Sequence, residues 1–158
     1  MPLPEELLKT VHLSARLHDE RNTLRDEAKE MLGFACLKEL TRAQLNGLVR
    51  FVLQADDKEQ VSSFLKKQMQ RRAAQATGLN SPLPGRNQTL AEHLEQYFAE
   101  TLWQKACEAA KTAYQSTCLA LGKKQPEEAP PDFAQEAWRR LAREFAGYIA
   151  GWHRIKTT

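Results

Sequence analysis

The chain has 158 residues, with 23 Lys and Arg against 20 Asp and Glu and a formal net charge of +3 at pH 7. A chain of this length can bury one sizeable core but is too short for two ordinary domains, so a single domain is expected over residues 1–158. Its apolar runs are far shorter than the roughly 20 residues that cross a bilayer, and its N-terminus lacks the basic start and apolar run of a secretory signal. The sequence therefore predicts a cytoplasmic protein with no membrane partner.

Apolar residues recur with a helical period along most of the chain, and strand patterns are nearly absent. The predicted fold is all-α, a single-domain bundle of about six helices with a long fifth helix and an aromatic-seamed C-terminal helix. Residues 7–54 are expected to form an N-terminal three-helix module, followed over residues 57–158 by a basic helix and a long C-terminal helical pair. Loops are expected near 78–88 and 123–131. The six helices are predicted at about 4–18, 20–32, 42–54, 57–77, 90–121 and 132–155.

Helix ends are predicted from capping residues and helix breakers. Thr41 with Gln44, and Thr89 with Glu92, have the spacing of capping boxes. Further start signals are Pro4, Asp56 or Asp57, and Asp132, and the glycines expected to end helices are Gly33, Gly78 and Gly122. The apolar face predicted for the first helix consists of Leu7, Leu8, Val11 and Ala15.

The C-terminal helix has a nearly strict apolar repeat that we call the aromatic seam. Its members, spaced by three and four residues, are Trp138, Leu141, Phe145, Tyr148, Trp152 and Ile155. This spacing suits a partner helix. The seam is expected either to pack on the fifth helix of the same chain or to stay partly exposed for self-association or docking. In the second case the partner interface would consist of Trp138, Phe145, Tyr148 and Trp152.

Catalytic and metal-binding motifs are missing from the sequence. There is no Gly-rich phosphate loop, HExxH, GxSxG or paired-carboxylate motif, and the three cysteines have no CxxC spacing. We therefore expect no enzymatic activity, no catalytic residues, no cofactor and no metal site. The four histidines lie far apart in sequence at His12, His18, His93 and His153.

Basic residues concentrate in the middle of the chain. Residues 60–126 contain 9 Lys and Arg against 4 Asp and Glu, a balance of +5, whereas residues 1–59 have a balance of −2 (9 against 11) and residues 127–158 one of 0 (5 against 5). Helical spacing predicts two basic faces backed by apolar residues, which could hold the phosphate backbone of RNA or DNA without reading sequence. The alternative is ordinary ion pairing within a helix, such as Glu136 with Arg140. The candidate nucleic-acid-binding residues are Lys66, Lys67, Arg71 and Arg72 on the fourth helix, and Arg139, Arg140, Arg143 and Arg154 on the last.

Residues 7–49 resemble the N-terminal part of the GemA-like regulatory proteins of Mu-type phages. That family has a Lys-x-x-His helix, an Arg in the next helix, a Gly and a small residue further on, and then Lys-Asp-Leu-Thr-x-Ala-Glu-Leu. The chain differs at Cys36, where Ser is usual, and at Glu39 and Gln44, which exchange acidic and amide groups. The resemblance implies a helical regulatory protein in a phage or mobile-element setting. The matching positions are Lys9, His12, Arg25, Gly33, Cys36 and the segment KELTRAQL at 38–45.

A second resemblance spans more of the chain. The segments LTRAQLNGLVRFV, FLKKQMQRRAAQ and FAGYIAGWHRI occur in the order of a capped helix, a basic central helix and an aromatic C-terminal end. In that order they are similar to the small helical subunits of type III CRISPR effector complexes, which implies a non-catalytic subunit that lines a nucleic-acid groove in a larger complex. A helical adaptor that binds only protein remains the third alternative.

Overall fold

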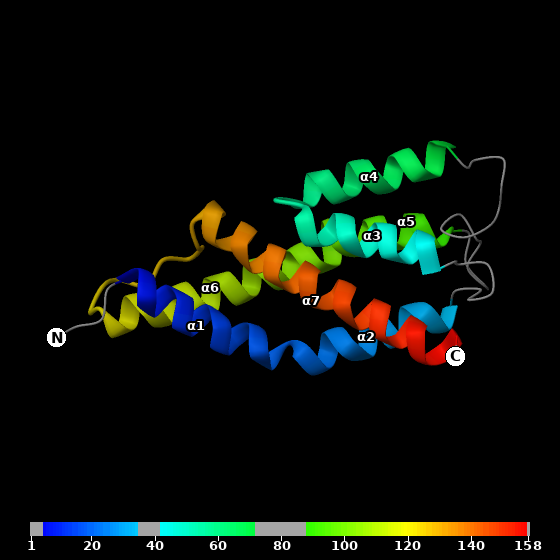
Figure 1. Ribbon diagram of the computed structural model, residues 1–158. Helices are drawn as coiled ribbons and strands as arrows, with labels where there is room; N and C mark the ends of the chain where they lie inside the picture. The colour runs from blue at the N-terminus through cyan, green and yellow to red at the C-terminus, as the bar shows by residue number, and fades with distance from the viewer. Residues whose placement is uncertain (1–4, 35–41, 72–87, 158) are drawn as a thin grey trace.

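The computed structural model describes residues 5–34, 42–71 and 88–157, and within them the chain is an all-α bundle without a β-strand (Figure 1). The predicted fold class is confirmed. The elements are α1 (Glu5–Asp19), α2 (Arg21–Phe34), α3 (Arg42–Gln54), α4 (Lys58–Arg71), α5 (Leu90–Gln96), the π-helical segment η2 (Tyr97–Thr101), α6 (Leu102–Ala120) and α7 (Pro131–Thr157).

The C-terminal helices α6 and α7 form the centre of the packing. Helix α7 lies against α6, α2 and α3, whereas α1 packs mainly on α6. Helix α4 packs on α5 and η2 at the edge of the bundle (Figure 1). The three N-terminal helices thus lie on the C-terminal pair more than on one another. The helices of the predicted N-terminal module, residues 7–54, therefore make most of their contacts with α6 and α7.

Two predicted helix ends are confirmed by their hydrogen bonds. Thr89 caps α5, because its hydroxyl accepts a bond from the backbone N–H of Glu92 at 3.2 Å. Gly122 ends α6 in the left-handed conformation, with φ of 70°. There the N–H of Lys123 donates to the carbonyl of Cys118 at 2.8 Å, which is the bond of a Schellman motif.

Asp57, rather than Asp56, caps α4. Its carboxylate accepts a bond of 3.0 Å from the backbone N–H of Gln60. The side chain of Gln60 in turn accepts the N–H of Asp56 at 3.0 Å, so two backbone donors at the start of the helix are satisfied.

Two other predicted ends are wrong by one or two residues. Helix α2 continues through Gly33 to Phe34, so Gly33 does not follow the helix. Helix α7 begins at Pro131 and contains Asp132 in its first turn. A proline fits the first helical position because its missing N–H would have no helical partner there. Pro4, Thr41 and Gly78 lie outside the described residues, and their capping roles stay predictions.

The predicted apolar face of α1 is also wrong. Leu7 and Val11 are 45% and 52% exposed, whereas Leu13 and Leu17 are 1% and 5% exposed. Apolar residues lie on two sides of this helix, with Leu7 and Val11 on one side and Leu13 and Leu17 on the other. Packing on α6 decided which side is buried.

The long fifth helix is present over residues 90–120 but contains the π-helical segment η2. At its end the N–H of Leu102 donates to the carbonyl of Tyr97, five residues back. A π turn holds one more residue than an α turn, so a carbonyl at its boundary can be left for another donor. In η2 the carbonyl of Phe98 accepts a hydrogen bond from Trp138 of α7.

Candidate nucleic-acid interface

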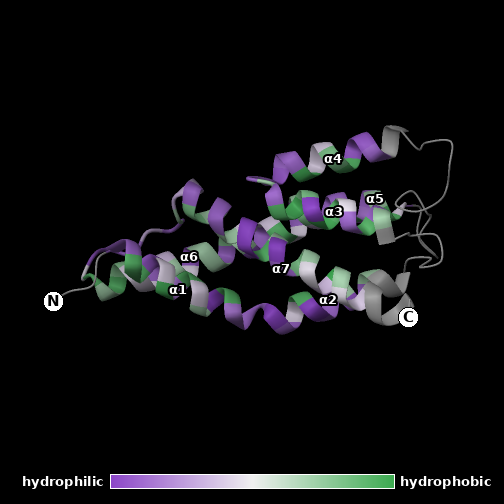
Figure 2. Ribbon diagram, in the orientation of Figure 1, coloured by the Kyte–Doolittle hydropathy of each residue, from purple (hydrophilic) through white to green (hydrophobic). Residues whose placement is uncertain are grey.

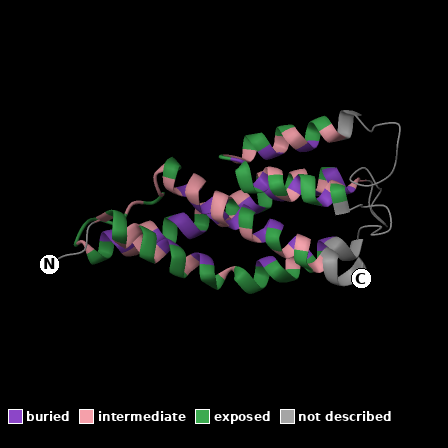
Figure 3. Cartoon of the chain, in the orientation of Figure 1, coloured by how far each residue is buried: buried purple, intermediate pink, exposed green. Residues whose placement is uncertain are grey.

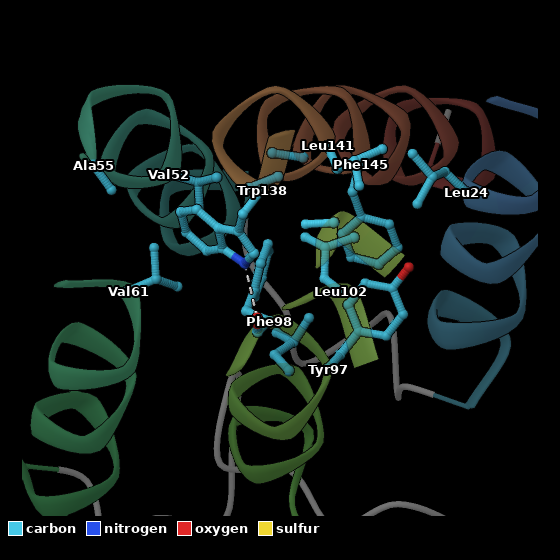
Figure 4. Close-up of a cluster of buried hydrophobic side chains, with 14 of the residues drawn as sticks. Leu24, Val52, Ala55, Val61, Tyr97, Phe98, Leu102, Trp138, Leu141 and Phe145 are labelled. Carbon is cyan, nitrogen blue, oxygen red and sulfur yellow. Dashed lines mark hydrogen bonds between the residues drawn. The ribbon is translucent and has the colours of Figure 1, made fainter. Parts of the chain in front are cut away.

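Half of the predicted partner interface lies in the hydrophobic core. Trp138 is 1% exposed and Phe145 is 0% exposed, so these two residues are not available to a partner and that interpretation is wrong for them. Figure 4 shows Trp138 beside Val52 of α3 and Val61 of α4. The ring of Phe145 stacks on Tyr97, with ring centroids 4.2 Å apart. The alternative that the seam packs within the same chain describes both residues.

The indole of Trp138 joins α7 to the π-helical segment. Its Nε1–H donates to the carbonyl of Phe98 at 2.8 Å, shown as the dashed line in Figure 4. The neighbouring carbonyl, that of Ala99, accepts a bond of 3.4 Å from Lys58 Nζ, which also lies 4.7 Å from the centre of the Trp103 ring. Side chains from α7 and α4 therefore donate hydrogen bonds to two backbone carbonyls of η2. These bonds matter because a buried carbonyl without a donor costs free energy.

The other two seam aromatics are half-buried and bonded within the chain. Tyr148 donates its hydroxyl to Glu144 at 3.0 Å, and burial followed by this bond raises the pKa of Tyr148. Trp152 donates its indole N–H to the carbonyl of Arg25 in α2 at 3.2 Å. Lys29, also on α2, lies 5.2 Å from the centre of the Trp152 ring. Trp152 thus joins α7 to α2, whereas the bond of Tyr148 lies within α7.

Two of the four residues of the predicted basic face of α7 are held in ion pairs, and they share one carboxylate. Arg139 and Arg140 bind the two carboxylate oxygens of Glu136 at 3.1 and 3.2 Å. Arg140 also donates to Ser14 of α1 at 3.0 Å, and the Nε of Arg139 is shielded from solvent. Arg143 is exposed, and the side chain of Arg154 lies outside the described residues. For Arg139 and Arg140, ordinary helical ion pairing is the interpretation that the contacts support.

The lysines of α4 differ from these arginines. Lys66 and Lys67 are both exposed, and no ion pair between described residues involves either one. They project from the side of α4 opposite Val61 and Leu65, each of which is 0% exposed. Figures 2 and 3 show hydrophilic residues predominating along α4 and exposed residues on its outer side. We call Lys66 and Lys67 the α4 basic surface.

The structure does not join the two predicted basic groups into one face. Helix α7 reaches the α3–α4 connector through Gln135, which donates to the carbonyl of Asp56 at 3.2 Å. That contact is at the acidic start of α4, and Lys66 lies more than two turns further along the helix. Arg140 instead points toward α1. Arg71 belongs to α4 but its side chain is not described, and Arg72 lies outside the described residues.

A half-buried polar network was missed by the sequence reasoning. Lys105 of α6 lies 3.2 Å from Glu27 of α2 and 4.0 Å from Glu20, which lies between α1 and α2. Tyr97 donates a short bond of 2.5 Å to Glu27, and burial together with this bond raises the pKa of Tyr97. Arg16 completes the network by binding Glu20 at 3.1 Å. The members come from distant parts of the chain, so no local spacing marked them.

Comparisons with protein-family models, with curated proteins and with solved structures find no match to this chain. The class that the molecule itself defines is an all-α bundle with a basic helix at its edge. None of the helices in the described ranges has a stretch long and apolar enough to span a bilayer.

Proposed function

We propose that the protein is a non-enzymatic nucleic-acid-associated accessory or regulatory protein whose α4 basic surface contacts backbone phosphates of RNA or DNA. The observation that carries this proposal is the exposure of Lys66 and Lys67 without an acidic partner among the described residues. The attraction of an exposed lysine for a phosphate is not offset when no carboxylate lies beside it. Each such contact releases counterions, so the binding would be salt-dependent and indifferent to sequence.

The charge distribution of the α3–α4 region supports the same proposal. Residues 42–71 contain six basic residues, at Arg42, Arg50, Lys58, Lys66, Lys67 and Arg71, and three acidic ones, at Asp56, Asp57 and Glu59. The three acids lie in the connector and in the first turn of α4, so the length of α4 after Glu59 contains basic residues and no acidic ones. A surface of one sign attracts a polyanion before contact as well as during it.

The resemblance to GemA-like regulatory proteins supports a phage or mobile-element setting for this activity. The resemblance to small subunits of type III CRISPR effector complexes supports the alternative that the same surface lines a groove in a larger complex. The two settings differ in whether the isolated chain binds. An isolated subunit of a groove would bind far more weakly than its complex, because each subunit supplies only part of the contacts.

The test is the binding of random single-stranded and duplex oligonucleotides over a salt series. We expect the parent protein to bind at low salt, with affinity falling as salt rises, and K66E/K67E to lose most of this binding. A single Lys-to-Ala change at either position should weaken binding equally across unrelated sequences and reduce the salt slope by about one unit.

The double variant K123E/K124E is the matched control. Lys123 and Lys124 are adjacent, exposed lysines near the other end of the molecule, and the charge change is the same. The exchange also loses the exposed contact of Lys123 with Glu5 at 3.5 Å, which contributes little to stability. Equal binding by the parent and folded K66E/K67E would show that the α4 basic surface does not contact the nucleic acid. A parent that binds neither oligonucleotide at low salt would favour the protein-only adaptor.

A further inference from the structure

A stacked pair of phenylalanines joins α3 to α4 beside the α4 basic surface. The rings of Phe51 and Phe64 have centroids 4.5 Å apart and planes inclined by 15°. Both side chains are half-buried at the margin of the core, so part of the pair is open to solvent. The stacked pair of Tyr97 and Phe145 is different, because those side chains are 6% and 0% exposed.

The surroundings of the ring pair are open and basic. On α4, Lys67 follows Phe64 by three residues, which places both on one side of the helix. On α3, Gly47 precedes Phe51 by four residues and is exposed, and a Cβ built on it would meet no atom within 4 Å. The two helices run in opposite directions around a short connector, so Gly47 and Lys67 lie on the same end of the ring pair (Figure 1).

We propose that Phe51, Phe64 and Lys67 form a stacking site for single-stranded nucleic acid. This inference rests on the proposed function and names its substrate class. An unpaired base would rest against the ring pair while Lys67 contacts the adjoining phosphate. Stacking on an aromatic ring accepts any base, because every base has a π-face, which suits a surface that does not read sequence. In a duplex both faces of each base are covered by neighbouring bases, so the rings add nothing there.

The test compares F64L and F51L with the parent on an oligothymidylate and on a random duplex of the same length. Leucine keeps the site apolar but removes the ring. We expect each variant to bind the single strand about 5- to 150-fold more weakly, which is the range for loss of one stacked base. Duplex affinity and the salt slope on either ligand should stay at the parent values. F64Y keeps a ring and should bind the single strand as the parent does.

F133L is the matched control. Phe133 of α7 is also half-buried, and its ring lies 6.0 Å from that of Tyr114 of α6. This variant should bind both oligonucleotides as the parent does. Circular dichroism and thermal unfolding check that each variant is folded, and if F64L is not, F51L and F64Y still decide the question.

The outcomes separate the stacking site from the phosphate contacts. If the parent binds and folded F51L and F64L bind the single strand equally well, the stacking site is wrong while the α4 basic surface stands. An equal loss on single strand and duplex would mean that the rings only hold α3 and α4 together. A parent that binds neither ligand overturns both proposals. Fluorescence of a 2-aminopurine base in the single strand gives a second readout, quenched by stacking in the parent and less quenched in F64L.

Discussion

Helices α4 and α7 both carry basic residues on the side opposite a buried apolar stripe, but the basic residues meet different neighbours. On α7, Arg139 and Arg140 follow Glu136 by three and four residues and share its carboxylate. On α4, the nearest acid before Lys66 is Glu59, seven residues away, and Ser63 stands at the position that Glu136 occupies relative to the arginines. On these two helices, an acid within one turn engages the arginines of α7, and its absence leaves Lys66 and Lys67 without an ion pair inside α4.

Helices α7 and α4 also differ in how deeply each is buried in the bundle. The apolar side of α7 contains the fully buried Trp138 and Phe145, and α7 contacts four other helices, α6, α2, α3 and α1. Helix α4 buries Val61 and Leu65 at the edge of the bundle and has exposed residues along its outer side, Lys66 and Lys67 among them (Figure 3). Substitutions on α7 should therefore change stability, and substitutions on the outer side of α4 should change binding.

The largest expected effect is that of W138A. The change removes a large core side chain and leaves the carbonyl of Phe98 without the indole donor, so the free energy of unfolding should fall by about 3–5 kcal/mol. Denaturant unfolding followed by circular dichroism measures it. W103A is the control, because Trp103 is only half-buried, and it should lose clearly less. Equal losses in the two variants would contradict the central place of the aromatic seam.

The second prediction concerns the polar network that contains Tyr97, Glu27 and Lys105. Y97F removes the hydrogen bond to Glu27 and should lower the free energy of unfolding by about 1.5 kcal/mol at pH 7, at the low end for a charged acceptor because Glu27 keeps Lys105. Burial raises the pKa of Tyr97 in the folded state, so its contribution is present below the ordinary tyrosine pKa of about 10 and is lost as pH rises above that value.

The pH dependence gives this prediction its sharpest measurement. Between about pH 10 and 11 the parent should lose about 1 kcal/mol more than Y97F, because only the parent has a tyrosine at position 97 that ionises on unfolding. Urea unfolding of both proteins at each pH isolates this difference from the titration of lysines, which both share. Parallel pH profiles would show that Tyr97 keeps an ordinary pKa in the folded protein.

The third prediction tests the helix on which α4 packs. T89A removes the cap of α5 and should lower the free energy of unfolding by about 1 kcal/mol. T101A is the matched control, because the side chain of Thr101 makes no capping bond at the start of α6 and alanine favours helix at least as well. Thermal unfolding should separate the two variants, and a T101A variant as unstable as T89A would contradict the cap.

The smallest expected effect belongs to E136Q. The change removes two partly exposed ion pairs of α7 and should lower the free energy of unfolding by less than about 1 kcal/mol. It also frees the charge of Arg139 and Arg140, so low-salt affinity for nucleic acid should rise slightly if pairing is what withholds these arginines. R143A, which alters an exposed arginine on the same helix, should not raise affinity. A fall in affinity in E136Q would contradict the comparison of α7 with α4.

The amino-acid sequence by itself determined the helices and several of their ends. A period of 3.6 residues, Thr89 before α5 and Gly122 after α6 are local signals, and local hydrogen bonds in the structure confirm both helix ends. The exposure of Lys66 and Lys67 follows from the same period, because Val61 and Leu65 lie on the opposite, buried side of α4. This part of the candidate site could be predicted, since it depends only on residues within two turns of one another.

Only the tertiary structure decided which apolar and polar groups meet across the bundle. Trp138 finds its acceptor 40 residues away in the sequence, at a π turn that no local pattern marked. The stacking of Phe51 on Phe64 and the burial of Leu13 rather than Val11 likewise depend on how separate helices pack. A helical period identifies sides of a helix, but it does not say which helix covers each side. That choice is made by shape and hydrogen bonding between segments far apart in the chain.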